Sequence, residues 1–429
     1  MAITGRAALI ALIATLAALL LRTVAGLVAV DSLIAAAIVA DIALAGSVRQ
    51  LRISRSGDER IMLGQSGSTT LTISNGGRRA VRGLLRDAWQ PSVGASGRVA
   101  ISIPARGGAA VTTTLRPTRR GDKAAGKVTV RSVGPLGLAA RQSGRVVPWT
   151  VRVLPPFLSR KHLPEKLARL RTLDGQHRSL IRGQGSEFDS LREYVIGDDV
   201  RSIDWRSSAK RSDVVVRTWR PERDRRVVLV LDTGRTSAGR VAGVPRLDAA
   251  MDAALLLGAL ASRAGDRVDL LAIDRLVRAR VVGASRSDVL PMMTDAMALL
   301  DSELAESDGG LMASTLLATA RQRCLVVLLT DLNGAALEFG LMPSIGLLAS
   351  RYRMLVAATA DPRITELSSA RGDAMAVYHA AAAERARAER ARVAATLASR
   401  GVDVVDAPPG ELAPALADAY LTLKAAGRL

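Results

Sequence analysis

The sequence has one cysteine, Cys324, and three histidines, so it lacks the residues of several common catalytic and structural sites. A single thiol excludes an internal disulfide and a cysteine-based zinc site. His162, His177 and His379 are far apart and form no H-E-x-x-H motif, which argues against a zinc hydrolase.

Motifs that bind phosphates or carry a nucleophile are also missing. The chain contains no G-x-x-x-x-G-K-[ST] loop, no G-x-G-x-x-G turn after a strand and no G-x-S-x-G elbow. It therefore offers no cradle for ATP or a dinucleotide and no serine-hydrolase nucleophile. We expect a protein that is not an enzyme; a metal-dependent hydrolase is the weakest alternative.

Aromatic side chains make up only 3% of a sequence that is 48% hydrophobic, so its apolar content is mostly Ala, Leu and Val. The 429 residues are enough for two or three domains. The formal charge of +20 raises the alternative of a protein that binds nucleic acid or anionic lipid. Because the basic residues are mixed with acids and aromatics for base stacking are scarce, nucleic acid is the less expected of the two.

Long apolar runs occur only near the N-terminus, at residues 7–21 and, after Arg22, at 24–46. A helix needs about 20 apolar residues to cross the hydrocarbon core. We therefore predict a transmembrane helical hairpin over residues 1–46. The positive flank that begins at Arg49 predicts two spans in the inner membrane with both termini cytoplasmic. A signal peptide cleaved near Ala25 is the alternative.

Two acidic residues, Asp31 and Asp41, interrupt the second apolar run. A charge at the centre of a bilayer costs about 2.5–3.5 kcal/mol. We expect both residues to lie toward the ends of the span. The alternative is that one of them pairs with Arg22 or with a polar group of a partner helix.

Residues 47–155 change to the two-residue period of β-strands. Ser68–Ser74 alternates polar and apolar side chains before an Asn-Gly-Gly turn, and Ala110–Leu115 repeats the pattern. Several short strands with Gly- and Pro-rich turns predict an all-β sandwich.

Residues 227–429 alternate short apolar runs with helical patterns. The runs 227–231 and 324–330 are typical of strands buried on both faces, and 246–263 has helical spacing. This order predicts an α/β domain of Rossmann type with a mostly parallel sheet. Residues 380–395 are rich in Ala, Glu and Arg, which predicts a solvated outer helix. Glu384 and Arg387, or Glu389 and Arg392, have the spacing of an ion pair on such a helix, and a coiled-coil contact is the alternative.

Two carboxylates, Asp232 and Asp331, follow the apolar runs at the strand ends. Ligands of open α/β sheets bind beyond the carboxyl ends of the strands, and Mg²⁺ prefers oxygen ligands. The loops at this edge are the first candidate for a partner-binding surface.

Residues 156–226 form a charged segment between the two predicted domains. Its central residues, which we call the signature, are Arg192, Tyr194, Gly197, Asp198, Arg201, Ile203, Asp204 and Trp205. Their order resembles the signature of the domain-of-unknown-function 58 family, and the resemblance extends over essentially the whole chain, including Arg116–Gly121 and Gly134–Leu138. We interpret the signature as an ion-paired clasp between the sandwich and the C-terminal domain, with a partner-binding site as the alternative.

The resemblance implies a von Willebrand A-like domain and, as partner, a MoxR-type AAA+ ATPase. Related domains bind a metal through D-x-S-x-S, a distant Thr and a distant Asp. Asp232, Thr236 and Asp331 match that pattern, so Mg²⁺ is the candidate cofactor. Gly234 replaces the first Ser, and Leu311 stands where the distant Thr is expected. Ser314 or Thr315 could replace that Thr, but each lies about a turn too late in the helix. The site is therefore degenerate.

Without metal, we expect Asp232 to cap the segment that follows it and to bond Thr236, and Asp331 to cap a turn. Arg235 is the candidate to place a guanidinium where the cation would lie. In either case the expected function is that of a membrane-anchored adaptor, which works with the ATPase in the assembly or maturation of other proteins. The oligomeric state is left open.

Overall fold

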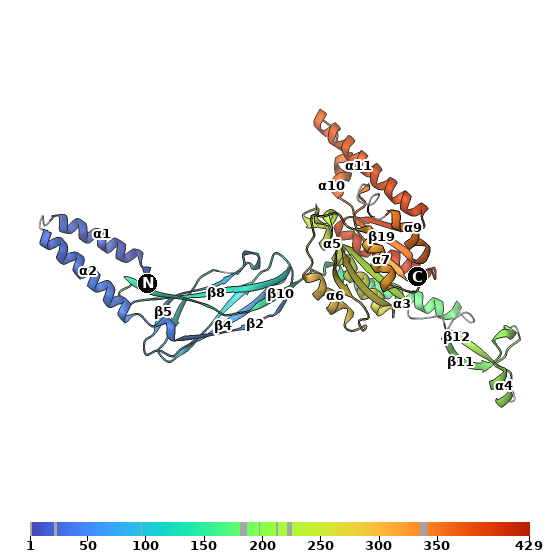
Figure 1. Ribbon diagram of the computed structural model, residues 1–429, viewed down its shortest axis with the longest axis horizontal. Coiled ribbons are helices and arrows are strands. Elements are labelled where there is room, and N and C mark those ends of the chain that lie inside the picture. The colour runs from blue at the N-terminus through green and yellow to red at the C-terminus, as the bar shows by residue number, and fades with distance from the viewer. Residues whose placement is uncertain are drawn as a thin grey trace. The chain divides into compact units, whose positions relative to one another are not determined.

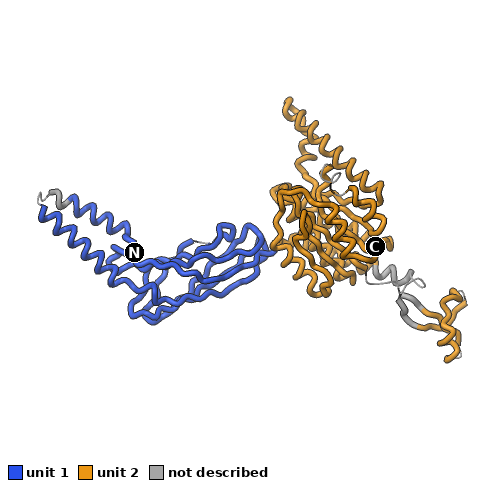
Figure 2. Tube along the Cα trace, in the orientation of Figure 1, with its two compact units in different colours: residues 1–154 blue, residues 155–429 orange. Residues whose placement is uncertain are grey.

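The computed structural model describes residues 2–20, 24–95, 97–180, 187–196, 198–211, 213–220, 225–334, 340 and 342–429. The chain divides into two compact units, Met1–Leu154 and Pro155–Leu429 (Figure 2). The segment predicted as a separate connector, 156–226, is grouped with the second unit.

Unit 1 begins with two apolar helices, α1 (Gly5–Leu20) and α2 (Val24–Leu44), which lie side by side (Figure 1). The stretch Val24–Gln50 is long and apolar enough to cross a membrane. The apolar part of α1, Gly5–Leu16, is shorter. Arg22 and the other residues of the connection lie outside the described residues.

The rest of unit 1 is built from two β-sheets, as the two-residue period predicts. One sheet has the order β2-β4-β7; in the other, β1-β9-β8-β10-β3 is extended by β5 on β8 and β6 on β5. The strands are β1 (Ala2–Ile3), β2 (Leu51–Gly57), β3 (Arg60–Met62), β4 (Gly67–Asn75), β5 (Val81–Trp89), β6 (Val99–Ile103), β7 (Gly108–Leu115), β8 (Gly121–Val133), β9 (Ala139–Val146) and β10 (Thr150–Leu154).

The two sheets of unit 1 pack face to face around a main core, and a smaller cluster contains Ile61 and Leu115. Leu71 and Ile73 of β4 are fully buried against Leu85 of β5 and Ile103 of β6. Alternate residues of these strands point to this core and to solvent, which is the pattern of a half-solvated sandwich.

The end of α2 is bound to the sandwich through Asp41. This carboxylate is fully buried and accepts backbone hydrogen bonds from Leu136, Leu138 and Ala139 at 2.7, 2.8 and 2.9 Å. It lies near the end of the helix, as expected, and its partners among the described residues are loop N–H groups. Asp31, by contrast, lies within the helix and is exposed, and its place relative to the end of a span stays a prediction.

The Gly134–Leu138 motif forms the loop that receives this carboxylate. A Cβ atom at Gly134 would lie 2.2 Å from Oδ1 of Asp41, so only glycine fits there. On the other side of the loop, Oγ1 of Thr4 donates to the carbonyl of Gly137 at 2.6 Å. Both ends of the α1–α2 pair are therefore attached to the same loop.

Unit 2 contains a six-stranded sheet with the order β17-β16-β13-β18-β19-β20. All neighbouring strands are parallel except the edge pair β16–β17. The strands are β13 (Arg226–Asp232), β16 (Arg267–Ile273), β17 (Val277–Val281), β18 (Leu325–Leu329), β19 (Arg353–Thr359) and β20 (Asp403–Ala407).

Helices cover both faces of this sheet (Figure 1). On one face α5, α6 and α12 bury a core around Leu229 and Leu255; on the other α7, α9 and α11 bury a second core around Val228 and Ile345. The result is the three-layer α/β arrangement that the alternation of patterns predicts. The helices are α3 (Leu163–Leu180), α5 (Arg246–Arg263), α6 (Val289–Ala298), α7 (Gly309–Thr319), α9 (Met342–Arg351), α10 (Pro362–Ser368), α11 (Ala374–Ser399) and α12 (Pro409–Ala425).

A small module precedes the sheet in the chain. Its strands β11 (Glu187–Glu193) and β12 (Val215–Arg220) pair antiparallel, and η4 (Val200–Ser202) and α4 (Trp205–Arg211) lie between them in sequence. We call these four elements and the described residues between them the signature module, because all but one of the family-signature residues are described there.

Candidate functional site

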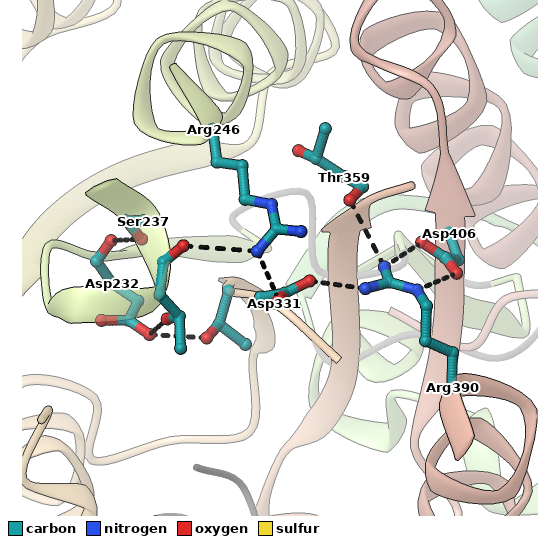
Figure 3. Close-up of polar contacts among 9 residues, drawn as sticks. Asp232, Ser237, Arg246, Asp331, Thr359, Arg390 and Asp406 are labelled. Carbon is teal, nitrogen blue, oxygen red and sulfur yellow. Dashed lines mark hydrogen bonds and ion pairs between the residues drawn. The ribbon is translucent and has the colours of Figure 1, made fainter. Parts of the chain in front are cut away.

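The polar side chains at the carboxyl edge of the unit 2 sheet come from four neighbouring strands and two helices (Figure 3). Parallel strands end at a common edge, so residues far apart in the sequence meet there. The residues of this edge are Asp232 at the end of β13, Thr330 and Asp331 after β18, Thr359 at the end of β19, Asp406 in β20, Arg246 in α5 and Arg390 in α11.

Asp232 has both carboxylate oxygens engaged. Oδ1 accepts from the backbone N–H of Gly234 at 2.9 Å and from Oγ of Ser307 at 2.5 Å. Oδ2 accepts from Oγ1 of Thr330 at 2.6 Å and, more weakly, from Oγ1 of Thr236 at 3.4 Å. The expected cap and the expected bond to Thr236 are both present.

Ser307 supplies the hydroxyl that Gly234 lacks. A Cβ atom at Gly234 would lie 2.1 Å from Oγ of Ser307, so the two positions compete for the same space beside Asp232. The hydroxyl thus reaches the carboxylate from the loop before α7 and not from the strand end. Ser314, considered as a replacement ligand from α7, instead donates to the carbonyl of Leu311.

Asp331 is held between two guanidinium groups and does not cap a turn as expected. Nη1 of Arg246 lies 2.6 Å from its Oδ2, and Nη1 of Arg390 lies 2.7 Å from its Oδ1 (Figure 3). The carboxylate side chain is only 6% exposed, so these charge-assisted bonds are made largely away from water. Arg235, the residue predicted for this role, pairs with Glu306 instead.

Arg390 links Asp331 to the outer strand of the sheet. Its Nη2 and Nε donate to Asp406 at 2.6 and 3.1 Å, and Nη2 also reaches the carbonyl of Thr359 at 3.4 Å (Figure 3). Burial opposes the charge of this guanidinium, but the hydrogen bond to Asp406 and the charge of Asp331 outweigh burial and raise the pKa of Arg390. Arg390 therefore stays protonated and fixes α11 on this edge.

The carboxylate oxygens at this edge are not free to bind a Mg²⁺ ion. A cation at Asp331 would have to share the carboxylate with two guanidinium groups, and the oxygens of Asp232 already accept four donors. Among the described residues no group of three or more His, Cys, Asp or Glu side chains is placed to hold a metal. Asp232, Thr236 and Asp331 do lie at one edge, and metal binding there stays a prediction.

The hollow beside these residues is small. Its volume is about 10 Å³, which is room for one water molecule. Hydroxyl groups, Arg246 and apolar side chains line it, and none of the lining residues is a histidine or a cysteine. Such a space does not enclose a substrate. The lining residues are Thr236, Ser237, Arg246, Ala250, Leu329, Thr330, Asp331, Ala357 and Thr359.

The described ion pairs of the signature module join residues of that same module. Arg192 pairs with Asp198 at 2.5 Å, and Arg217 pairs with Asp204 at 2.8 Å. The clasp between the sandwich and the C-terminal domain stays a prediction. The bond to Arg192 and a backbone bond from Val195 lower the pKa of Asp198.

Two short helices, η4 and α4, follow one another in the signature module. Asp199 caps η4, and Asp204 accepts from the backbone N–H of Ser207 at 2.9 Å, so a second helix begins at Trp205. This backbone bond and then Arg217 lower the pKa of Asp204.

The remaining signature residues have structural or exposed positions. Ile203 forms a β-bridge with Val216, and the backbone N–H of Tyr194 donates to the carbonyl of Val214. Arg201 and Trp205 are exposed. Gly197 lies outside the described residues.

Sequence reasoning missed Ser307, Thr330, Arg246, Arg390 and Asp406. Thr330 is adjacent to the predicted Asp331, and that proximity was the one available signal. Ser307 lies in a loop without a pattern. Arg390 belongs to a run of Ala, Glu and Arg that reads as solvated throughout, although its Glu384–Arg387 pair is present as expected, at 2.8 Å.

Comparison with known proteins places this chain near uncharacterised relatives. Residues 190–395 match the family model described as "Protein of unknown function DUF58". The uncharacterized protein Rv1480 of Mycobacterium tuberculosis and Mb1516 of Mycobacterium bovis are each 29% identical over 231 residues, covering 50% of this chain and 72% of the relative.

Solved structures resemble this chain only at low similarity. The CARDB domain of the PF1109 protein from Pyrococcus furiosus aligns with 24% of this chain and 86% of its own, with 13% identity and a TM-score of 0.19. A FixG-related protein from Vibrio parahaemolyticus aligns with 24% of this chain and 96% of its own, with 10% identity and a TM-score of 0.18. The match to the DUF58 model is thus the comparison that bears on residues of the candidate site and the signature module.

Proposed function

We propose that this chain is a membrane-anchored adaptor that binds another protein through the loops at the carboxyl edge of the unit 2 sheet. The observation that carries the proposal is the engagement of Asp331 by Arg246 and Arg390. A carboxylate held by two guanidinium groups is a poor general base and a poor metal ligand, but it makes a rigid support for recognition loops.

The proposed contact is the loop that contains Leu304 and Ser307. Its residue Leu304 is 79% exposed, while the flanking residues are fixed to the sheet: Ser307 on Asp232, and the carbonyl of Ala305 on the N–H of Arg235 at 2.8 Å. An exposed apolar side chain on a fixed loop is suited to insertion into a partner. The resemblance to the DUF58 family favours a von Willebrand A-like fold for this unit and a MoxR-type AAA+ ATPase as the partner.

We further propose that α1 and α2 both cross the inner membrane and that the sandwich and unit 2 lie in the cytoplasm. Support comes from the apolar length of α2 and from the basic residues Arg49 and Arg52, which follow it directly. Both termini would then be cytoplasmic. Labelling of single introduced cysteines from either side of sealed membrane vesicles tests this orientation.

Site-specific crosslinking in native membranes tests the adaptor role. A photoreactive residue at position 304 should capture a defined partner, and one at Leu347 should not. Leu347 is 58% exposed on α9, a helix that leads from this edge to the start of β19. Equal capture at both positions, or none at 304, would overturn the proposed surface; capture of a protein other than an ATPase would overturn only the identity of the partner.

A further inference from the structure

The net positive charge of the chain is concentrated in unit 1. Residues 1–154 hold 21 of the 60 basic residues but only 6 of the 40 acidic ones, so this unit carries 15 of the 20 net positive charges. The positions of the six acids decide which surface of the unit is purely basic. These acids are Asp31, Asp41, Asp58, Glu59, Asp87 and Asp122.

Two of the acids lie at the end of the sandwich that is farthest from α2. The helix ends at Leu44, and β2 begins shortly after it at Leu51. Asp58 and Glu59 follow Gly57, the last residue of β2. The two ends of this strand are about 20 Å apart. Salt at physiological strength screens most of the interaction between exposed charges over such a distance.

The other four acids also leave the α2 end of the sandwich without an exposed carboxylate. Asp122 pairs with Arg152, whose backbone N–H bonds the chain at the far end of β2. Asp87 is buried in an ion pair inside the sandwich, and Asp41 is buried in its three backbone bonds. Asp31 lies about 15 Å farther along the axis of α2. Among the described residues of unit 1, the exposed charge around the end of α2 is therefore positive.

Arginine side chains contact the end of α2 directly. Arg79 donates to a carbonyl of its last turn, and Arg141 donates to another through Nε at 2.9 Å. Arg145 donates to two carbonyls of the segment that follows the helix, at 2.5 and 2.6 Å. A cation at the carboxyl end of a helix stabilises the helix dipole, which accounts for these contacts. It does not account for the further arginines of the neighbouring turns.

Two turns bring these further arginines to the same end. The backbone N–H of Arg106, in the β6–β7 turn, donates to the carbonyl of Gly77 in the β4–β5 turn at 3.2 Å. The N–H of Gly76 donates to the carbonyl of Gln50 at 3.3 Å, so both turns are bonded to η1 (Val48–Gln50). We call six exposed arginines of this end the basic collar: Arg6, Arg49, Arg78, Arg79, Arg82 and Arg106.

The apolar helices fix this end of the sandwich at the depth where they leave a membrane. Only residues 45–47 separate α2 from η1, and the start of α1 is bonded to the loop that receives Asp41. That loop carries Leu136, an apolar side chain that is 55% exposed. If α1 and α2 span the bilayer, the basic collar and Leu136 lie in the headgroup layer.

Anionic phospholipid has the chemistry that fits this position. A guanidinium group donates to phosphate oxygens in a matched planar geometry. Each cation near an anionic surface strengthens association with that surface about fivefold, and here no exposed carboxylate of the described residues competes for it. An acidic protein segment would satisfy the same charge, but the helices place a lipid surface there.

We propose that the basic collar binds the headgroups of anionic phospholipids around the base of the α1–α2 pair, with Leu136 at the boundary of their acyl chains. This inference rests on the proposed membrane attachment and not on the adaptor role. The bound lipids hold the sandwich on the leaflet and, through the bonds of Asp41, hold the ends of both helices.

The test uses the full chain in lipid nanodiscs, labelled with a fluorophore at Ala105→Cys, an exposed position in the β6–β7 turn. The native Cys324 gives little background because it is buried, and burial raises the pKa of its thiol to about 12. The discs contain equal amounts of phosphatidylglycerol and phosphatidylcholine, and only one of the two lipids has brominated acyl chains. We expect brominated phosphatidylglycerol to quench the label at least about twice as strongly as brominated phosphatidylcholine, because the collar enriches the anionic lipid beside it.

A second label position and two charge variants are the controls. A label at Ser56→Cys, exposed near the far end of β2, should show no difference between the lipids. Arg78→Gln with Arg106→Gln should bring the quenching ratio at position 105 close to one, and it spares Arg79 and Arg141, which bond α2. The matched change at the far end leaves the ratio as it was. It combines Arg116→Gln with Arg119→Gln, two exposed residues that follow β7.

Three outcomes would contradict this inference. Equal quenching by the two lipids in incorporated, unmodified protein overturns it and favours an acidic protein segment as the occupant. A ratio that the collar variant does not lower also overturns it, because the selectivity then comes from elsewhere. Failure of the chain to enter the discs refutes the membrane attachment itself, and the inference falls with it.

Discussion

The carboxylate of Asp41 in α2 accepts the backbone N–H of Leu138 at 2.8 Å, across 97 residues of sequence. Together with the bonds from Leu136 and Ala139, it joins the apolar helices to the sandwich through a buried contact. The presence of the charged residue Asp41 near the end of α2 is thus explained by its hydrogen bonds to this loop. Motion of α2 is expected to move the Gly134–Leu138 loop with it.

Replacing Asp41 should therefore loosen unit 1. Asp41→Ala leaves the N–H groups of Leu136, Leu138 and Ala139 without their acceptor, the last two of them buried, at a cost of roughly 3–5 kcal/mol in total. Hydrogen–deuterium exchange should show faster exchange of residues 136–139. Asp31→Ala, an exposed position in the same helix, is the control and should change nothing. Unchanged protection of the loop in Asp41→Ala would refute the structural role of this carboxylate.

Arg390 should be a major stabilising residue of the unit 2 edge. Arg390→Met leaves Asp406 without its bidentate partner and Asp331 with one guanidinium, so we expect a loss of about 3–5 kcal/mol. Arg387→Met, three residues earlier on the same helix, removes a half-exposed pair with Glu384 and should cost under about 1 kcal/mol. Urea unfolding of both variants makes the comparison; equal losses would contradict the assigned role.

The contrast between Arg387 and Arg390 shows where sequence reasoning ends. Strands such as β4, β7, β13 and β18 and most of α11 follow from periodicity, because burial on one or two faces leaves a direct trace in the pattern. The inward direction of Arg390 leaves no such trace, since it depends on Asp331 and Asp406, which lie on two other strands. The roles of Ser307 and of the Leu138 N–H could not be predicted for the same reason. Their hydrogen-bond partners are fixed by the topology of the fold and not by spacing in the sequence.

The competition between positions 234 and 307 predicts a compensating pair of substitutions. Gly234→Ser alone places a Cβ near Oγ of Ser307 and should destabilise unit 2 by about 1–3 kcal/mol. Ser307→Ala alone removes one bond to the Asp232 carboxylate and should cost about 1–2 kcal/mol.

The double variant should lose at least about 1 kcal/mol less stability than the sum of the two single losses, because one hydroxyl replaces the other. Recovery remains incomplete, since the carbonyl oxygen of Ala305 lies 3.0 Å from the added Cβ. Chemical denaturation of the four proteins of this cycle provides the measurement. Strict additivity would show that the two positions do not compete.

Asp252 should make the stability of unit 2 depend on pH. Burial raises the pKa of this carboxyl in α5, although Ser159 donates to it from its backbone N–H and its Oγ at 3.1 and 3.0 Å. A raised folded-state pKa favours the protonated form, so its contribution to stability is fully present below the ordinary value of 3.8. That contribution is lost as the pH rises through the folded pKa.

Asp252→Asn cannot ionise and keeps an oxygen for Ser159. Its unfolding free energy relative to the unmodified chain should therefore increase as the pH rises above 3.8 and then level off. Urea titrations at a series of pH values, with Asp418→Asn as a control whose carboxylate is ion-paired with Lys166, measure this difference. A difference that is flat with pH would rule out the raised pKa.

Magnesium should leave the unit 2 edge unchanged, because two arginines already neutralise Asp331. We expect the same thermal midpoint in excess EDTA and in millimolar Mg²⁺. A ligand present at 100 times its Kd would stabilise the folded state by about 2.7 kcal/mol, so a real site is detectable in this way.

The matched variant is Arg246→Met, which frees Oδ2 of Asp331. A Mg²⁺-dependent rise in the midpoint of the unmodified chain, abolished by Asp331→Asn, would show that the ion displaces the guanidinium groups and that the edge is a metal site after all.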